Sequence, residues 1–145
     1  MGARKFFTQE QKESILLAIS DAERLTSGEI CVHLDTRCKG DQIERAIYLF
    51  DKLGLEKTRL KNGVLIYLAI EDRKLAIIGD EGINTAVPEG FWDEVRDLMI
   101  HHFKEGDFVT GLTEGIRLAG AQLGVHFPRQ DNDINELSND ISFAE

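Results

Sequence analysis

The stretch NGVLIYLAIEDRKLAIIG, residues 62–79, decides the fold of this protein. Its first part, GVLIYLAI at 63–70, is an unbroken apolar run, which is typical of a central strand covered on both faces. Glu71, Asp72 and Arg73 then interrupt the run, and KLAIIG at 74–79 has the pattern of a second strand. Because the connection is so short, the two strands must form an antiparallel hairpin.

Two helices and a strand are predicted before this hairpin. The first helix covers about residues 9–25, since Thr8 begins a capping box and apolar residues then recur at helical spacing. The segment EICVHLDTR, residues 29–37, alternates between a fully apolar face and a mixed face, as a strand does. The second helix begins with a capping box at Asp41 and ends before Gly54, which occupies the usual position of a C-terminal glycine.

Two more helices are predicted after the hairpin. Pro88 occupies the favoured first position of a helix that ends near Gly106. Asp107 can cap the last helix, which ends at Phe127. Three glycines inside this last helix each cost up to about 1 kcal/mol relative to alanine. Close packing against a neighbouring helix would offset this cost at Gly111, Gly115 and Gly120.

The order of these elements predicts an α/β fold, a three-layer α/β/α sandwich. A mixed sheet of about four strands is flanked by about four helices. The strands at 29–37 and 63–70 should be joined by a parallel crossover, and a fourth short strand is expected near 84–87 or in the tail. The expected division is an α/β domain over 1–128 and an acidic tail over 129–145 that docks partly on the domain.

Composition and charge narrow the possible partners. The 145 residues carry a net charge of −9 and the pI is about 4.9. Nucleic acid is excluded as a partner because phosphate binding needs a basic face, whereas cations or basic proteins fit. No window approaches the roughly 20 apolar residues of a membrane span, and the N-terminus has no secretion signal. Cys31 and Cys38 are placed to remain free thiols, so a soluble cytoplasmic protein is expected.

Polar residues converge where the predicted strands begin and end. If strand 74–79 is antiparallel to the other two strands, its end lies beside their beginnings, and Asp80 meets Asn62 and Glu29 at one edge. Carboxylate and amide oxygens are the ligands that Ca²⁺ and Mg²⁺ prefer. The sequence therefore offers Asp80, Glu81, Glu29 and Asn62 as candidate metal ligands. The alternative is that GDEG at 79–82 only turns the chain.

The opposite edge of the sheet has its own acidic residues. Asp35 and Asp72 are secondary candidates for a cation, although a turn with solvated or ion-paired charges is the preferred interpretation of this region. Cys31 and His33 share one strand face, but no second Cys or His pair accompanies them. Packing in the core is therefore favoured over a zinc site.

Several segments in the same order resemble the TPM domain family. They are FTQEQKESILLAISDAERLTSGEI, FDKLGLEKT, NGVLIYLAIEDRKLAIIGDEGI and FKEGDFVTGLTEGI. The resemblance covers about residues 6–128, and the ending FP followed by NELSNDISF resembles a bacterial subgroup.

The resemblance implies an α/β sandwich fold, a divalent-cation site and phosphate-ester hydrolysis. One plant relative, in the thylakoid lumen, is regarded as an acid phosphatase of photosystem II repair, and calcium is associated with the fold. The positions that match the recurrent polar segments of the family are Asn62, Gly63, Asp72, Arg73 and 79–82. Many members carry an export signal and a C-terminal membrane anchor, and this sequence shows neither, which argues against a role at the cell envelope.

Three functions remain open at this stage. The first is a Ca²⁺- or Mg²⁺-binding accessory domain that interacts with another protein. The second is a metal-assisted phosphatase in which Asp80 is the candidate carboxylate. Arg73 could be the positive group that holds the phosphate, but its expected distance from Asp80 counts against this function. The third is a scaffold or assembly factor that takes no small ligand.

Overall fold

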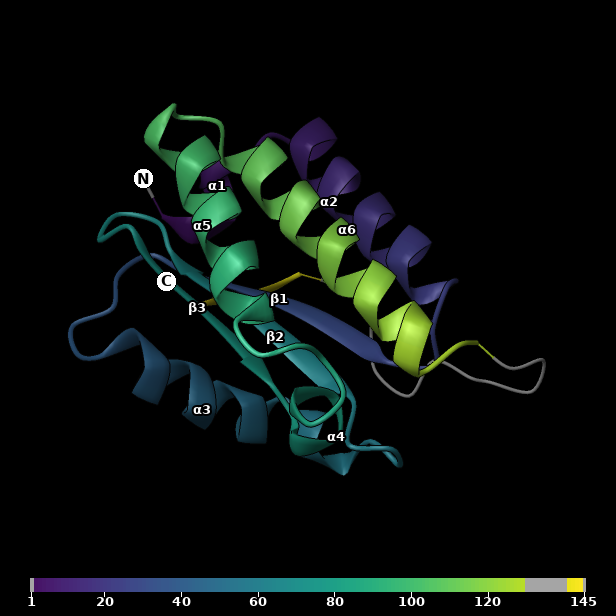
Figure 1. The fold of residues 1–145 in the computed structure, drawn as a ribbon. Helices are drawn as coiled ribbons and strands as arrows, with labels where there is room; N and C mark the ends of the chain where they lie inside the picture. The colour runs from purple at the N-terminus through teal and green to yellow at the C-terminus, as the bar shows by residue number, and fades with distance from the viewer. Residues whose placement is uncertain (1, 130–140, 145) are drawn as a thin grey trace.

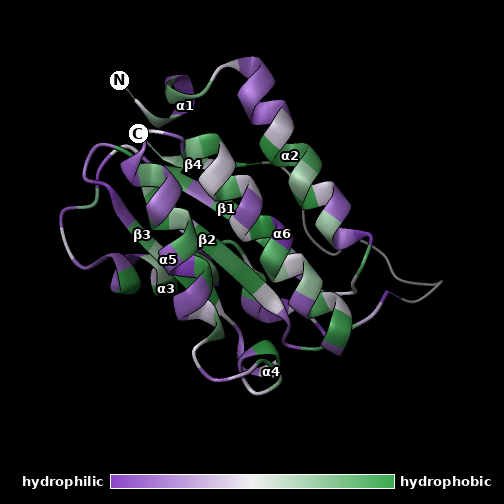
Figure 2. Ribbon diagram, turned by 45° about the horizontal axis from the view of Figure 1, so that its top comes forward, coloured by the Kyte–Doolittle hydropathy of each residue, from purple (hydrophilic) through white to green (hydrophobic). Residues whose placement is uncertain are grey.

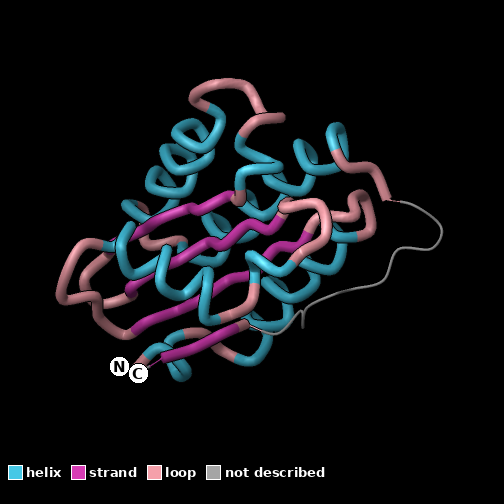
Figure 3. The backbone as a smooth tube through the Cα atoms, turned by 90° about the horizontal axis from the view of Figure 1, so that it is seen from below, coloured by secondary structure: helices cyan, strands magenta, loops and turns pink. Residues whose placement is uncertain are grey.

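A four-stranded mixed sheet forms the centre of the protein. The structure, a computed structural model, describes residues 2–129 and 141–144. The strand order is β3-β2-β1-β4, and Figure 3 shows the four strands side by side with helices on both faces. The strands are β1 (Glu29–Asp35), β2 (Gly63–Ala69), β3 (Lys74–Gly79) and β4 (Ser142–Ala144).

Helices cover both faces of this sheet, which confirms the predicted sandwich (Figure 1). Helices α2, α5 and α6 lie on one face and α3 lies on the other. The helices are α1 (Ala3–Phe6), α2 (Gln9–Glu23), α3 (Gln42–Lys52), α4 (Glu81–Asn84), α5 (Phe91–Lys104) and α6 (Phe108–His126), with a 3-10 turn, η1, at Leu55–Lys57. The four long helices match predicted ones, whereas the short helices α1 and α4 were not predicted.

The strand directions agree with the prediction. β1 pairs with β2 in parallel, with Glu29 opposite Gly63, and β2 pairs with β3 antiparallel, with Val64 opposite Gly79. The fourth strand lies in the tail, where β4 pairs in parallel with the end of β1. The start of β1, the start of β2 and the end of β3 therefore lie together at one end of the strands. We call this end of the sheet the lower edge.

The core explains why β2 holds the centre of the sheet. Every residue of β2 is buried, and Figure 2 shows this strand as hydrophobic along nearly its whole length. Val64, Ile66 and Leu68 pack toward α2, α5 and α6, whereas Leu65 and Tyr67 pack toward α3. A strand with two apolar faces can be stable only between two layers of helices.

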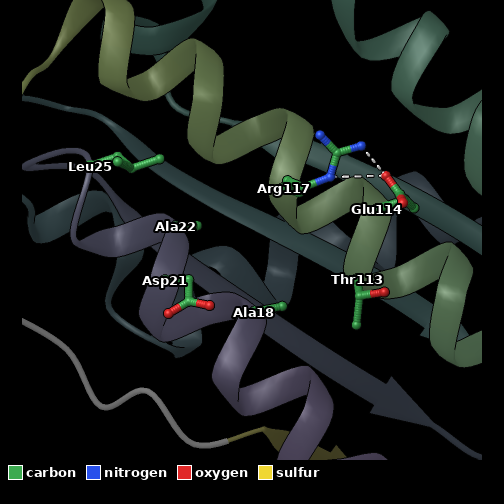
Figure 4. Close-up of a pocket in the computed structure, with 7 residues that line it drawn as sticks. All are labelled: Ala18, Asp21, Ala22, Leu25, Thr113, Glu114 and Arg117. Atoms are coloured by element: carbon green, nitrogen blue, oxygen red, sulfur yellow. Dashed lines mark hydrogen bonds and ion pairs between the residues drawn. The ribbon is translucent and has the colours of Figure 1, made fainter.

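Glycines in α6 allow the helices on one face to approach closely, as predicted. A Cβ atom at Gly120 would lie 2.5 Å from the Cβ of Ala22 in α2, and one at Gly115 would lie 2.4 Å from the Sδ of Met99 in α5. Figure 4 shows α2 running alongside α6 at a shallow pocket of about 230 Å³. Close contact between the helices offsets the low helix propensity of glycine.

The helix ends follow their predicted signals except at α3 and α5. At α3 the structure shows only one half of the predicted capping box, the hydrogen bond from Glu44 N to Asp41. Thr8 and Gln11 form a complete capping box, Asp107 accepts a hydrogen bond from Thr110 N at 3.1 Å, and Gly54 has a φ of 78°. Helix α5 begins at Phe91, so the prediction of a start at Pro88 was wrong. The reason is Gly90, whose left-handed φ of 82° interrupts helical geometry between the two positions.

None of the helices in the described part of the chain is long and apolar enough to cross a lipid bilayer.

Candidate functional site

The backbone at the lower edge brings together the segments that the sequence predicted would meet. Glu29 N donates to Asn62 O at 3.4 Å, and Asp80 N donates to Gly63 O at 2.9 Å. The starts of β1 and β2 and the end of β3 are therefore adjacent, because the first two strands are parallel and the third is antiparallel to them.

Asp80 is fixed at this edge through only one of its two carboxylate oxygens. Oδ1 accepts a hydrogen bond from Glu81 N at 2.7 Å and caps the first turn of α4. Oδ2 is buried and has no hydrogen-bond partner among the described residues. The carboxyl group is thus held in place by the chain through one oxygen, while the other oxygen receives no hydrogen bond from the described residues.

Asn62 is the second polar side chain at this position. The residue is 2% exposed, its backbone N–H donates to Thr58 Oγ1 at 3.3 Å, and its side-chain Nδ2 is buried without a partner in the described part of the chain. Rotation of the amide about its last bond exchanges Nδ2 and Oδ1. The same position can therefore present an oxygen ligand.

Gly82 packs the start of α4 directly against the loop before β2. A Cβ atom at Gly82 would lie 2.4 Å from both Leu60 O and Lys61 O. Only a residue without a side chain allows this approach. Because the loop and α4 are in contact, the carbonyl groups of the loop lie near Asp80.

Glu23 and Glu29 form a separate pair of buried carboxyl groups at the same edge. Glu23 is 6% exposed and Glu29 is 3% exposed, and Glu23 Oε2 accepts a hydrogen bond from Ile30 N at 2.9 Å. Burial raises the pKa of Glu23, while its hydrogen bonds to Ile30 and Glu29 and the charge of Arg129 oppose this shift. Burial and these two carboxylates also raise the pKa of Cys31 to about 12.

Buried side-chain atoms without a hydrogen-bond partner are concentrated at the lower edge. Among the described residues these atoms are Glu23 Oε1, Glu56 Oε2, Asn62 Nδ2 and Asp80 Oδ2. Glu56 belongs to η1, whose Leu55 packs on Gly63 at the start of β2. Three of the four atoms are carboxylate oxygens, the type of ligand that a hard cation takes.

The predicted ligands do not all converge on one point. Glu29 and Asp80 flank Gly63 on neighbouring strands, so their backbones are about two strand spacings, roughly 10 Å, apart. Glu81 is exposed. Within residues 2–129 and 141–144, no group of three or more His, Cys, Asp or Glu side chains is arranged to hold a metal ion. Of the predicted ligands, Asp80 and Asn62 are the two that carry a buried side-chain atom without a hydrogen-bond partner in the described part of the chain.

The opposite edge holds a hydrogen-bond network around Asp35. His33 Nε2 lies 2.7 Å from Asp35 Oδ1, Tyr67 OH donates to Oδ2 at 2.5 Å, and Arg45 Nε donates to Oδ2 at 2.9 Å. His33 Nδ1 also lies 2.8 Å from Ser142 Oγ on β4. The network ties three strands and α3 together.

Hydrogen bonding sets the protonation states in this network. Burial alone would raise the pKa of Asp35, but hydrogen bonds from His33, Arg45 and Tyr67 outweigh it and hold the pKa well below its usual range. Burial and the hydrogen bond to Asp35 raise the pKa of Tyr67. Asp35 is therefore an ionised carboxylate whose oxygens are both engaged by protein donors.

The other acidic side chains of this edge also have partners. Asp72 Oδ2 accepts a hydrogen bond from Cys38 N at 2.7 Å, and Glu71 pairs with Arg37 at 3.1 Å. Asp35 lines a cavity of about 710 Å³ together with residues 37–41 of the loop before α3. The two secondary candidates, Asp35 and Asp72, thus serve the protein structure through these bonds.

Sequence reasoning missed three of these features. Glu23 and Glu56 were not proposed as part of the lower edge, because each lies in a segment whose place beside β1 or β2 depends on tertiary packing. The Asp35 network was also missed. The alternation of His33 and Asp35 on one strand face was its only sequence signal.

Comparison with known proteins agrees with this architecture. The NMR structure of the BA42 protein from the psychrophilic bacterium Bizionia argentinensis has 46% sequence identity to this chain and a TM-score of 0.90, over 97% of each chain. The N-terminal domain of a P. gingivalis protein shares the fold at 20% identity and a TM-score of 0.70, over 87% of this chain and 83% of that one.

A more distant structure is the N-terminal domain of a Corynebacterium glutamicum protein, with 16% identity and a TM-score of 0.65, over 80% of this chain and 73% of that one. No curated protein sequence matches the chain. A family model of the TPM domain matches residues 3–122. Since this match covers most of the sequence and includes the lower edge, the chain belongs to the TPM domain family.

Proposed function

We propose that this protein is a divalent-cation-binding accessory domain that takes Ca²⁺ or Mg²⁺ at the lower edge. The observation that supports the proposal best is the buried Asp80 Oδ2, which has no hydrogen-bond partner among the described residues. A buried carboxylate oxygen needs a donor or a cation to offset its lost hydration. The fixed Oδ1 of the same group orients Oδ2 in advance.

The residues at this position suit a hard cation. Asp80 would hold the ion, Asn62 would supply an amide oxygen, and the exposed Glu81 is close enough in sequence to turn toward it. Both Ca²⁺ and Mg²⁺ accept carboxylate and amide oxygens and retain water molecules in their remaining positions. With only two carboxylates next to the ion, we expect weak binding, with a Kd on the order of 0.1–1 mM.

The buried pair Glu23 and Glu29 supports the same proposal in a different way. These carboxyl groups add negative potential at the lower edge without reaching the ion at Asp80. Leu60, which is 41% exposed, lies next to this edge in the loop that contacts Gly82. A protein partner that engages the domain here would contact both the ion and this apolar side chain.

A metal-assisted phosphatase is the alternative function. It requires a positive group near Asp80 to hold the phosphate. Arg73 lies at the other end of β3, roughly 20 Å away by the rise of a strand, so it does not serve this role. The phosphatase alternative therefore depends on another cationic group, and a hydrolysis assay separates it from cation binding alone.

The test is a calorimetric titration of Ca²⁺ and Mg²⁺ into the wild-type protein, Asp80→Asn and Asp41→Asn. Both aspartates cap helices through one oxygen, as Asp41 accepts a hydrogen bond from Glu44 N at 3.0 Å. Asparagine caps a helix about as well as aspartate, so both variants should fold. We expect Asp80→Asn to weaken binding at least about tenfold and Asp41→Asn to leave it unchanged.

Two outcomes would change this proposal. Equal affinity of Asp80→Asn and the wild type would exclude the lower edge as the cation site. Metal-dependent hydrolysis of p-nitrophenyl phosphate that is lost in Asp80→Asn would favour the phosphatase.

A further inference from the structure

A pocket beside β3 lies at the end of the sheet opposite to the lower edge, apart from the two pockets described above. It has a volume of about 350 Å³ and is lined by the turn between β2 and β3, the start of α3, α5 from Arg96 onward and the start of α6. The turn and the start of α3 lie on the left of the molecule in Figure 1. Leu75 and Phe103 belong to its apolar floor, and its rim carries Arg73, Lys74, Arg96 and Lys104.

The charge of this pocket is opposite to that of the protein. The whole chain has 26 acidic and 17 basic residues. The pocket is lined by four basic side chains and by no aspartate or glutamate in the described part of the chain. Such a concentration of positive charge attracts anions to one place on an acidic protein.

Two of the four basic side chains are already engaged. Arg96 lies 3.2 Å from Asp93 and 3.3 Å from Asp97, and Lys74 Nζ donates to Cys38 O and Gly40 O at 2.9 Å each. Within residues 2–129 and 141–144, Arg73 and Lys104 have no hydrogen-bond or ion-pair partner. Their charges are therefore available to a ligand.

The backbone at Arg73 gives a second reason to assign a role to this side chain. Arg73 has a φ of 54°, in the left-handed region, where a side chain is disfavoured and glycine is not. A residue kept in such a conformation suggests that its side chain has a function. Lys61 has the same φ of 54° but lies at the other end of the molecule, next to β2.

We propose that this pocket binds a small amphipathic anion, with a carboxylate or phosphate head on a hydrocarbon body. The apolar floor would take the body, and Arg73 and Lys104 would hold the head through charge-assisted hydrogen bonds. The volume is within the range of small-molecule sites. An anionic membrane is disfavoured because the net charge of −9 would repel it.

This proposal is independent of the cation site and has its own test. Octanoate, 1-octanol and acetate are titrated into the full-length protein and followed by backbone amide NMR. We expect octanoate to shift amides of the β2–β3 turn, of α5 and of Phe108, and to bind at least about tenfold more tightly than octanol or acetate.

Two glycine variants form a matched pair for this test. Arg73→Gly and Lys61→Gly each remove one positive charge and relieve the same left-handed φ. We expect both to keep or raise the Tm, but only Arg73→Gly to weaken octanoate binding, by about tenfold. Lys104→Gln, which keeps the Arg73 side chain, should also weaken octanoate binding.

Several results would overturn the proposal. These are equal binding of octanoate and octanol, equal effects of the two glycine variants, and amide shifts that lie outside the pocket. Binding of the wild type to phosphatidylglycerol vesicles without binding of free octanoate would assign the surface to membranes instead.

Discussion

Two aspartates in this protein, the buried Asp35 and the half-buried Asp80, have opposite environments. Asp35 has hydrogen bonds to both oxygens and a pKa held low by them. Asp80 has one oxygen bound by a backbone N–H and one without a partner in the described part of the chain. The first arrangement is that of a structural carboxylate. The second leaves one buried oxygen without a donor, and this oxygen is the basis of the proposed cation site.

The structural role of Asp35 predicts a large cost for its removal. Asp35→Asn leaves Arg45, Tyr67 and His33 facing a neutral group, and breaking a buried charge network costs about 3 kcal/mol of unfolding free energy. Asp41→Asn, at an exposed helix cap, should cost less than about 0.5 kcal/mol. Urea denaturation of both variants measures the difference, and equal costs would show that the network contributes little.

The lowered pKa of Asp35 also predicts how the stability of the fold depends on acid pH. Because the pKa of Asp35 is lowered in the folded state, its contribution to stability is present above the ordinary value of 3.8 and is lost as the pH falls through the folded pKa. The pKa of Glu23 is raised, so its contribution has the opposite sign and is lost as the pH rises. We therefore expect the loss of unfolding free energy below about pH 4 to be shallower in Asp35→Asn.

Gly82 predicts a further stability effect at the lower edge. In Gly82→Ala the new methyl group would lie 2.4 Å from two backbone carbonyl oxygens, which cannot move aside as a side chain can. Overpacking of this kind costs about 2 kcal/mol. Gly40→Ala is the control, because a Cβ atom there meets nothing within 4 Å. A Gly82→Ala protein as stable as Gly40→Ala would contradict the described contact of α4 with the loop.

At the scale of elements, the long helices and the hairpin could be predicted from sequence, and the short elements could not. Residues 63–79 have local signals for both strands and for the turn between them. Helix α4 has only four residues, and its start at Glu81, after the capping Asp80, looks in sequence like a simple turn. Strand β4 has three residues, and pairing with β1 rather than local sequence fixes its position.

The candidate site was predictable only as far as the backbone determines it. Strand directions place Glu29, Asn62 and Asp80 at one edge, and the structure confirms that arrangement. Side-chain positions depend on packing that sequence patterns do not contain. Leu55, for example, packs on Gly63 between the strand ends that carry Glu29 and Asp80.

The attachment of β4 gives a prediction at the same scale. The ring of Phe143 lies under Arg4 and Lys12, with distances of 5.2 and 5.3 Å to the ring centroid, and Thr36 N donates to Ala144 O at 3.0 Å. Phe143→Ala removes the packing that holds this strand at the sheet edge. We expect hydrogen exchange at the Thr36 amide to accelerate at least about tenfold, while central β2 amides keep their protection.

Val125→Ala is the matched control for this exchange measurement, because Val125 is 70% exposed and far from β4 in sequence. Unchanged exchange at Thr36 in Phe143→Ala would show that backbone pairing alone holds the strand.

At the scale of the whole molecule, the strands connect the lower edge to a far end that holds both the Asp35 network and a pocket with a basic rim. The lower edge carries the buried carboxyl groups of Glu23 and Glu29 and the half-buried Asp80, and the pocket with the basic rim lies at the far end. Strand β3 runs from one region to the other, from Lys74 to Gly79. Cation binding and anion binding are therefore expected to be independent in this domain.

Paramagnetic broadening by Mn²⁺, which takes the same oxygen ligands as Mg²⁺, tests the central claim most directly. Substoichiometric Mn²⁺ is added to the ¹⁵N-labelled protein, and the loss of each amide signal reports its proximity to the ion. We predict selective broadening at residues 60–63 and 80–82, which excess Mg²⁺ reverses and which is absent in Asp80→Asn. Broadening centred instead on residues 35–41 and 72, or spread evenly over the acidic surface, would contradict a cation site at the lower edge.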